Sequence, residues 1–171
     1  MILVRHAESE WNRHFSQTRI DPGIPDPALT ETGRLQAGQL VERLAEEGIR
    51  RLVASPYRRA LETARIVSKA LEVPISVEPL VRERCVFSCD LGTPRSELQR
   101  LWPELDFAHL EERWWGEPEE SETSLALRCG AFRAKTAQLA DRRRIAVISH
   151  WGFIRALTGE ELANAAFVRI A

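Results

Sequence analysis

Three short apolar runs, each ending abruptly in polar residues, constrain most strongly what this chain can fold into. The first run ends in Arg5 and His6, the second in Ser55, and the third in Ser149 and His150. Short apolar runs bounded by polar residues are typical of buried strands. Helical patterns lie between them, and strands that alternate with helices favour a parallel sheet. We therefore predict an α/β fold with a mostly parallel sheet flanked by helices.

The residues after the first strand have the chemistry of an anion site. Ligands of open parallel sheets bind just beyond the carboxyl ends of the strands, so we expect Arg5 and His6 to lie at a site. A guanidinium matches the geometry of phosphate oxygens, and a neutral imidazole can act as a nucleophile or as an acid and base. The pair indicates phosphoryl chemistry, with a purely structural histidine as the alternative.

A second anion signal lies in the helix that we predict to start at Ser55 and Pro56. Serine caps helices, and proline suits their first position. Arg58 and Arg59 then fall in the first turn, where the helix dipole disfavours cations. A bound anion would offset this mismatch. The alternative interpretation is two solvated arginines.

The rest of the pattern predicts scaffold elements. Residues 14–28 are expected to form a loop, because prolines interrupt them. We predict a helix from Thr30 to about Glu47, a strand at residues 74–77, a helix from Ser121 or Ser124, a central strand at residues 145–149, a short helix at residues 153–157 and an edge strand at residues 165–170. The spacing assigns two apolar helix faces, comprising Leu35, Leu40, Val41 and Leu44 in the first and Leu125, Cys129, Phe132, Thr136 and Leu139 in the second.

At about residues 84–121 the chain is irregular and rich in aromatic residues. It holds Trp102, Phe107, Trp114 and Trp115 and one predicted short helix near residues 93–103. We expect most of these rings to pin the insert to the body of the protein and one to face the substrate. Residues 1–171 are predicted to form a single domain, because this length supports one well-buried core.

Composition excludes several classes of partner. The 24 Lys and Arg residues balance 25 Asp and Glu residues, so net charge predicts no nucleic acid and no anionic membrane as a partner. The chain shows no long apolar run and no pattern of a signal peptide at its start, so we expect a soluble, cytoplasmic protein. The odd number of cysteines argues against a disulfide framework, and the spacing of Cys85 and Cys89 is unusual for a zinc site. We therefore expect reduced thiols that bind no metal.

Taken together, the motifs resemble those of the histidine phosphatase superfamily, the phosphoglycerate mutase-like proteins. The likeness runs from Ile2 to Thr158 and rests on Arg5-His6 with Ser9 and Asn12, the stretch from Asp26 to Gly33 with Gln36 and Ala37, the helix start Ser55-Pro56 with Arg59-Ala60, and Ser149-His150 with Gly152. Four ordered motifs are far more specific than any one of them. The resemblance implies a three-layer α/β/α sandwich.

The resemblance also implies roles for individual residues. His6 resembles the nucleophile that forms a phosphohistidine, and Glu83 resembles the proton donor of one branch of the family. The phosphate pocket implied by the resemblance comprises Arg5, Arg59 and His150, with Ser9 and Asn12 as additional contacts. No metal and no cofactor are expected. The residues alone leave an alternative to the role of acid for Glu83, namely an exposed ion pair with its flanking arginines.

Several positions depart from the family pattern. Ala7 stands where the family usually has glycine, and Trp151 stands where a small residue is common. After Glu83 the chain lacks the aromatic-glycine stretch of typical mutases, and it is shorter than they are. Both differences favour a phosphatase over a mutase.

We therefore predict a metal-independent hydrolase of phosphomonoesters that takes a small phosphorylated substrate and releases inorganic phosphate. The alternatives are a phosphoglycerate mutase or other phosphotransferase, a catalytically silent phosphate-binding module, and a module directed at protein phosphohistidine. If a homodimer exists, the aromatic residues of the insert would suit its contact.

Overall fold

The computed structural model describes residues 1–170, so Ala171, the last residue of the predicted domain, lies outside the described residues. Its centre is a five-stranded sheet with the order β3-β2-β4-β1-β5. The strands are β1 (Ile2–Arg5), β2 (Arg51–Ala54), β3 (Ile75–Val77), β4 (Ile145–Ser149) and β5 (Phe167–Arg169). The first four pair in parallel, and β5 pairs antiparallel to β1 at one edge. The predicted mostly parallel sheet, its central strand and its edge strand are confirmed.

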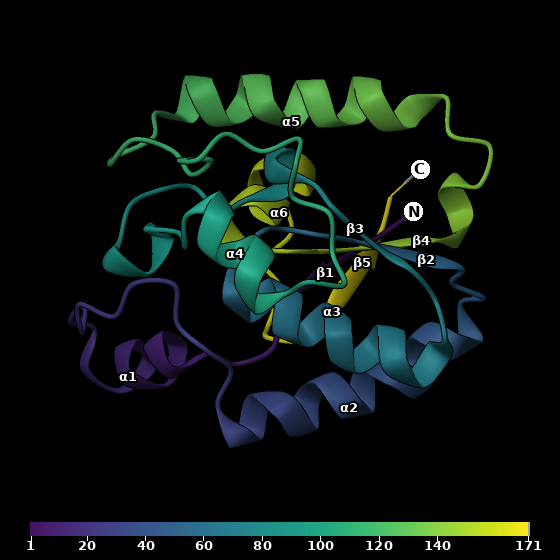
Figure 1. Ribbon diagram of the computed structural model, residues 1–171, viewed down its shortest axis with the longest axis horizontal. Helices are drawn as coiled ribbons and strands as arrows, with labels where there is room; N and C mark the ends of the chain where they lie inside the picture. Colours follow the sequence, from purple (N-terminus) through teal and green to yellow (C-terminus); the bar gives the residue numbers. More distant parts are fainter. Residues whose placement is uncertain (171) are drawn as a thin grey trace.

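Helices cover both faces of this sheet (Figure 1). One face carries α2 (Glu31–Glu46), α3 (Arg58–Leu71) and α4 (Arg95–Leu101), and the other carries α5 (Glu122–Ala137) and α6 (Trp151–Thr158). Successive residues of a strand point to opposite faces. In β1, accordingly, Ile2 and Val4 pack with the first group, whereas Leu3 packs with the second. The predicted α/β/α sandwich is confirmed.

The helix α2 begins where its cap was predicted. The Thr30 hydroxyl accepts a hydrogen bond from the amide of Gly33 at 2.9 Å. Leu35, however, is 65% exposed, so its assignment to the buried face was wrong. Gly33, Ala37, Leu40 and Leu44 form the buried face instead, at a spacing of three and four residues that leaves Leu35 on the solvent side.

Part of the predicted loop at residues 14–28 is helical. The helix α1 (Glu10–Thr18) is capped by Ser9, whose hydroxyl accepts a hydrogen bond from the amide of Asn12 while the Asn12 side chain accepts one from the amide of Ser9. This reciprocal capping box stabilises a helix that has one buried residue, Trp11. The hydrophobic periodicity was therefore too weak to predict it.

Two predicted helix starts are also displaced. The N-cap of α3 is Tyr57, not Ser55, and α6 begins at Trp151, two residues before the predicted start. In the insert, α4 lies where a short helix was predicted. Trp102, Phe107 and Trp114 are buried in the core beside α2 and α3, which confirms the pinning role. These three rings therefore offer no exposed surface for the dimer contact that we considered.

The cysteines Cys85, Cys89 and Cys129 are buried as free thiols. None of the helices within residues 1–170 combines the length and the apolar character that crossing a membrane requires.

Two glycines of α2 provide a matched test of how this helix docks on the segment after β1. A Cβ at Gly33 would lie 2.0 Å from the backbone oxygen of Glu8, whereas a Cβ at Gly38 would meet nothing within 4 Å. Gly33→Ala should therefore destabilise the fold by about 2 kcal/mol or more. Gly38→Ala should stabilise it by about 0.5–1 kcal/mol, because alanine is the better helix former. Urea unfolding followed by tryptophan fluorescence measures both, and equal effects of the two substitutions would contradict the close approach.

Candidate active site

A cavity of about 540 Å³ opens at the carboxyl ends of the parallel strands. Six of the predicted site residues line it: Arg5, His6, Ser9, Asn12, Arg59 and Glu83. The seventh, His150, is fully buried directly behind them, and its ring lies 5.0 Å from that of His6 between centroids. Arg58 instead points outward and pairs with Glu62. The structure thus brings together all seven predicted residues and separates the two neighbouring arginines.

The tautomer of His6 follows from its one hydrogen bond. Its Nδ1 lies 2.7 Å from the backbone oxygen of Ala7. Because a carbonyl oxygen only accepts, Nδ1 must carry the proton, which leaves Nε2 with a free lone pair. Burial, together with the guanidinium groups of Arg59 and Arg5, holds the pKa of His6 well below its ordinary value. His6 is therefore a neutral imidazole with an available nucleophilic nitrogen.

Two nitrogens beside His6 have no protein partner. Arg5 Nε and His150 Nδ1 are among the buried side-chain nitrogens without a hydrogen bond in the described part of the chain. The other groups of these side chains are held: Arg5 donates to the oxygen of Leu162 at 2.8 Å, and His150 Nε2 lies 2.8 Å from the hydroxyl of Ser55. Burial is also the main cause of the low pKa of His150. Buried polar groups normally find partners, so these nitrogens are suited to a bound anion.

Arg59 is held by an acid that sequence reasoning missed. Its guanidinium donates to the oxygen of Cys89 at 2.7 Å and to the carboxylate of Asp90 at 3.1 Å. Arg59 and Asp90 are 2% and 1% exposed, so the pair is shielded from water. The other oxygen of Asp90 accepts from the amides of Val86 and Phe87. Asp90 lies in an irregular stretch, where no periodicity marked it.

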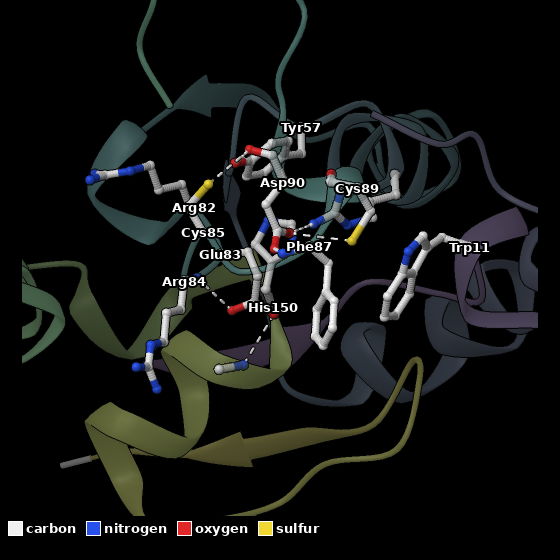
Figure 2. A network of polar contacts seen from close by, with 12 residues as sticks. Trp11, Tyr57, Arg82, Glu83, Arg84, Cys85, Phe87, Cys89, Asp90 and His150 are labelled. Carbon is white, nitrogen blue, oxygen red and sulfur yellow. Dashed lines mark hydrogen bonds and ion pairs between the residues drawn. The ribbon is translucent and has the colours of Figure 1, made fainter. Parts of the chain in front are cut away.

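The carboxylate of Glu83 lies against the first turn of α6 (Figure 2). It accepts hydrogen bonds from the amides of Arg84 at 2.8 Å, Gly152 at 3.1 Å and Phe153 at 3.2 Å. A Cβ at Gly152 would lie 2.5 Å from the Glu83 carboxylate, so a larger residue would displace it. Burial and the nearby charge of Asp90 raise the pKa of Glu83, despite the opposing effect of its amide donors. Glu83 is therefore a carboxyl group that retains its proton to a higher pH than usual.

Arg128 of α5 fixes the backbone that carries Glu83. Its guanidinium donates to the oxygens of Leu80, Arg82 and Glu83 and forms a buried ion pair with Glu120 at 2.6 Å. The sequence held a signal for this residue, since Arg128 falls between Leu125 and Cys129 on the apolar face of the helix. A charged residue in such a position requires buried partners.

Ser9 and Asn12 have a structural role in addition to lining the cavity, because they cap α1. The side chain of Asn164 also lines the cavity and donates to the backbone oxygen of His6 at 3.0 Å and to the side chain of Asn12 at 3.2 Å. Asn164 was not predicted, because it lies in a short loop after α6 with no motif around it.

The aromatic residues of the cavity differ from those expected. None of the four rings of the insert lines it, so the prediction that one of them faces the substrate was wrong. The cavity is lined instead by Trp11 and Phe15 of α1, by Phe87 and by Trp151. Trp102, Phe107 and Trp114 pack in the core, and Trp115 packs against it. Phe87, which belongs to the same insert, and α1, which carries two of the lining rings, were not predicted to contribute.

The arrangement combines a neutral imidazole, groups that can bind an anion and a carboxyl group of raised pKa in one site. Such a combination suits transfer of a phosphoryl group, in which the protein positions the group and stabilises its charge. Within residues 1–170 no three His, Cys, Asp or Glu side chains gather as a metal ion would require.

Comparison with known proteins gives one family match. Residues 1–167 match the family described as the histidine phosphatase superfamily, branch 1. Phosphoserine phosphatase 1 of Hydrogenobacter thermophilus is 30% identical over 168 residues, which cover 92% of this chain and 73% of that protein. A probable phosphoglycerate mutase of Photorhabdus laumondii is 42% identical over 83 residues, 48% of this chain. The match spans only 37% of that mutase.

A solved structure shares the fold. The mycobacterial glucosyl-3-phosphoglycerate phosphatase in complex with VO3 has a TM-score of 0.68 and 21% identity. The alignment covers 98% of this chain and 88% of that chain.

The buried ion pair of Arg128 predicts a large loss of stability when one partner is removed. Arg128→Met should destabilise the fold by about 3–5 kcal/mol, because Glu120 and three backbone oxygens lose a buried donor. Arg100→Met removes an exposed arginine and should cost less than about 1 kcal/mol. Urea unfolding measures both. A small effect of Arg128→Met would mean that water replaces the guanidinium and that the segment carrying Glu83 is not held as described.

Proposed function

Since the chain belongs to branch 1 of the histidine phosphatase superfamily, we propose that it is a metal-independent phosphomonoester hydrolase that acts through a phosphohistidine at His6. The observation that carries the proposal is the free Nε2 of His6, with its fixed tautomer and low pKa, beside the unpartnered nitrogens of Arg5 and His150.

In the first step, the substrate phosphoryl group binds with its oxygens against Arg5, His150 and Arg59. Nε2 of His6 attacks phosphorus, and the bond from phosphorus to the ester oxygen breaks as the new bond to nitrogen forms. Glu83 gives its proton to the departing oxygen, so the product leaves as a neutral alcohol. The guanidinium groups of Arg5 and Arg59 stabilise the charge that spreads over the three remaining phosphoryl oxygens.

In the second step, water replaces the alcohol. The carboxylate of Glu83 takes a proton from this water as its oxygen attacks phosphorus, and the bond from phosphorus to Nε2 breaks. Inorganic phosphate is released, His6 is again a neutral imidazole and Glu83 is again protonated. The net reaction consumes one ester and one water and yields one alcohol and one phosphate.

The two-step reaction needs a deprotonated histidine and a protonated glutamate at the same pH. This is the reverse of the order in which the two side chains ordinarily lose their protons. A glutamate in water loses its proton at a lower pH than a histidine does. Here burial lowers the pKa of His6 and raises that of Glu83. Both shifts enlarge the population that has a free imidazole and a protonated acid, which is the reactive form of the enzyme.

Relatives support a phosphatase more directly than a mutase. The phosphoserine phosphatase matches over nearly all of this chain, whereas the probable mutase matches over about half of it. A small phosphorylated molecule is the proposed substrate, since the phosphate-binding donors lie inside a cavity rather than on an open surface.

Replacing the nucleophile should abolish turnover. With a chelator present, the parent should hydrolyse 4-nitrophenyl phosphate and be inhibited by vanadate, while His6→Ala should lose at least about 10³-fold in kcat/KM. His14→Ala removes an exposed histidine of α1 and is the matched control. Acid-labile, base-stable phosphate should be trapped on the parent during turnover and be absent from His6→Ala. Loss of activity with the chelator would contradict metal independence, and full activity of His6→Ala would contradict the role of His6.

The pH profile tests Glu83. Activity of the parent should rise as His6 loses its proton at low pH and fall as pH increases through the raised pKa of Glu83, because the acid form is then lost. Glu83→Gln should lower kcat about 10²–10⁴-fold for an alkyl phosphate and remove the high-pH fall. The loss should be much smaller for 4-nitrophenyl phosphate, whose leaving group needs little protonation. Exposed Glu42→Gln is the control. An unchanged profile in Glu83→Gln would reject Glu83 as the proton donor.

A further inference from the structure

The cavity is larger than its phosphate-binding groups require. It has a volume of about 540 Å³, whereas one water molecule occupies about 30 Å³ of liquid volume. A phosphoryl group therefore fills only a small part of it. The remaining space can accommodate the leaving group, which is the part of the substrate attached to the ester oxygen.

One wall of that space is a continuous group of three aromatic rings, which we call the ring wall: Trp11, Phe15 and Phe87. The rings of Trp11 and Phe15 are stacked, with centroids 4.4 Å apart and planes 14° apart. Phe87 is tilted against both, at centroid distances of 5.0 and 5.3 Å. Figure 2 shows Trp11 and Phe87 beside each other on one side of Glu83 and His150.

The ring wall is held in place by hydrogen bonds from two separate segments. The carboxylate of Asp21 accepts from the indole nitrogen of Trp11 at 2.9 Å and from the amide of Ser88 at 2.8 Å. Asp90, next to the phosphate pocket, holds the amide of Phe87 itself at 3.0 Å. The rings are therefore positioned before any ligand arrives, although Phe87 remains 40% exposed. A fixed, exposed ring surface inside a cavity is suited to an apolar ligand group.

The charged side chains of the cavity do not favour a second anion close to the phosphate. Arg59 is paired with Asp90, and Arg84 donates to the oxygen of Glu120 and lies 3.7 Å from Glu122. Arg19 also lines the cavity, with its guanidinium 5.9 Å from the centroid of Phe15. A second acidic group beside Arg59 or Arg84 would therefore meet cations that already have partners.

We propose that the ring wall is the subsite for the leaving group, and that the substrates are phosphomonoesters of alcohols with a flat, apolar ring next to the ester oxygen, such as aryl phosphates. This proposal rests on the proposed function, because the ring would be presented to the wall only when its phosphoryl group occupies the donors around His6. Trp151, which lines the cavity from α6, bounds the same space.

Direct binding of phosphonates separates recognition of the ring from catalysis. Benzylphosphonate and ethylphosphonate both place a methylene group on phosphorus, and they differ by a phenyl ring in place of a methyl group. Neither can be hydrolysed, so calorimetry on the intact chain measures affinity without any contribution from leaving-group chemistry. The parent should bind benzylphosphonate about tenfold more tightly than ethylphosphonate, since ring packing supplies the difference.

Substitutions then test which residues cause the preference for benzylphosphonate over ethylphosphonate. Phe87→Ala should remove most of it while leaving the affinity for ethylphosphonate unchanged, and the exposed position of Phe87 means that the fold should tolerate the change. Phe15→Leu, which keeps an apolar side chain without a ring, should reduce the preference in part. Leu127→Ala removes a side chain of α5 that is 72% exposed and should change neither affinity.

The outcomes distinguish this proposal from the proposed function. Equal binding of the two phosphonates, or a preference that survives Phe87→Ala, would overturn the ring wall as the subsite and leave the phosphatase proposal intact. A ring preference in a protein that hydrolyses no phosphomonoester would support the subsite and reject the hydrolase. Failure of both phosphonates and of inorganic phosphate to bind would reject both.

Discussion

The parallel pairing of β4 with β1 on one side and with β2 on the other is the constraint on which the site depends. Residue registers place Arg5 beside Ser149 and Ala54 beside Ile148, so the three strands end at the same level. The next residues of the chain are His6, Ser55 and His150. Their proximity therefore comes from backbone hydrogen bonds in the sheet, although these residues are far apart in sequence. The helices contribute what the strand ends lack, namely amide donors and the Arg59 guanidinium.

The acid is positioned by a different means. Glu83 follows β3 and lies in a segment without regular structure, so no ladder of hydrogen bonds defines its place. Arg128 instead holds this segment by donating hydrogen bonds to three of its backbone oxygens. The first amides of α6 orient the Glu83 carboxylate by donating to it. The proposed nucleophile is thus held by the sheet, and the proposed acid is held by Arg128 of α5 and by amides of α6. Because separate elements carry them, substitutions in α5 can affect the acid without moving the nucleophile.

Much of this arrangement could be predicted from the sequence, and the failures have physical causes. Strand ends and helix faces produce periodic patterns, so the mostly parallel sheet, its central and edge strands, the inward Arg59 and the cluster of predicted residues followed from them or from the family motifs. Asp90 and Asn164 lie in irregular segments whose conformation depends on contacts far away in the chain. Ser55 was wrongly assigned as a helix cap because a serine followed by a proline is also the local pattern of a helix start. Ser55 is instead held by its contact with His150, which lies 95 residues away in sequence and therefore outside any local pattern.

The ion pair of Arg59 with Asp90 has a consequence for the last step of the proposed reaction. An arginine that already has a buried counter-ion attracts a phosphate dianion less strongly than a free one, because the incoming anion also meets the charge of Asp90. In the proposed reaction, the released phosphate would meet the same opposing charge, so this ion pair would weaken product inhibition.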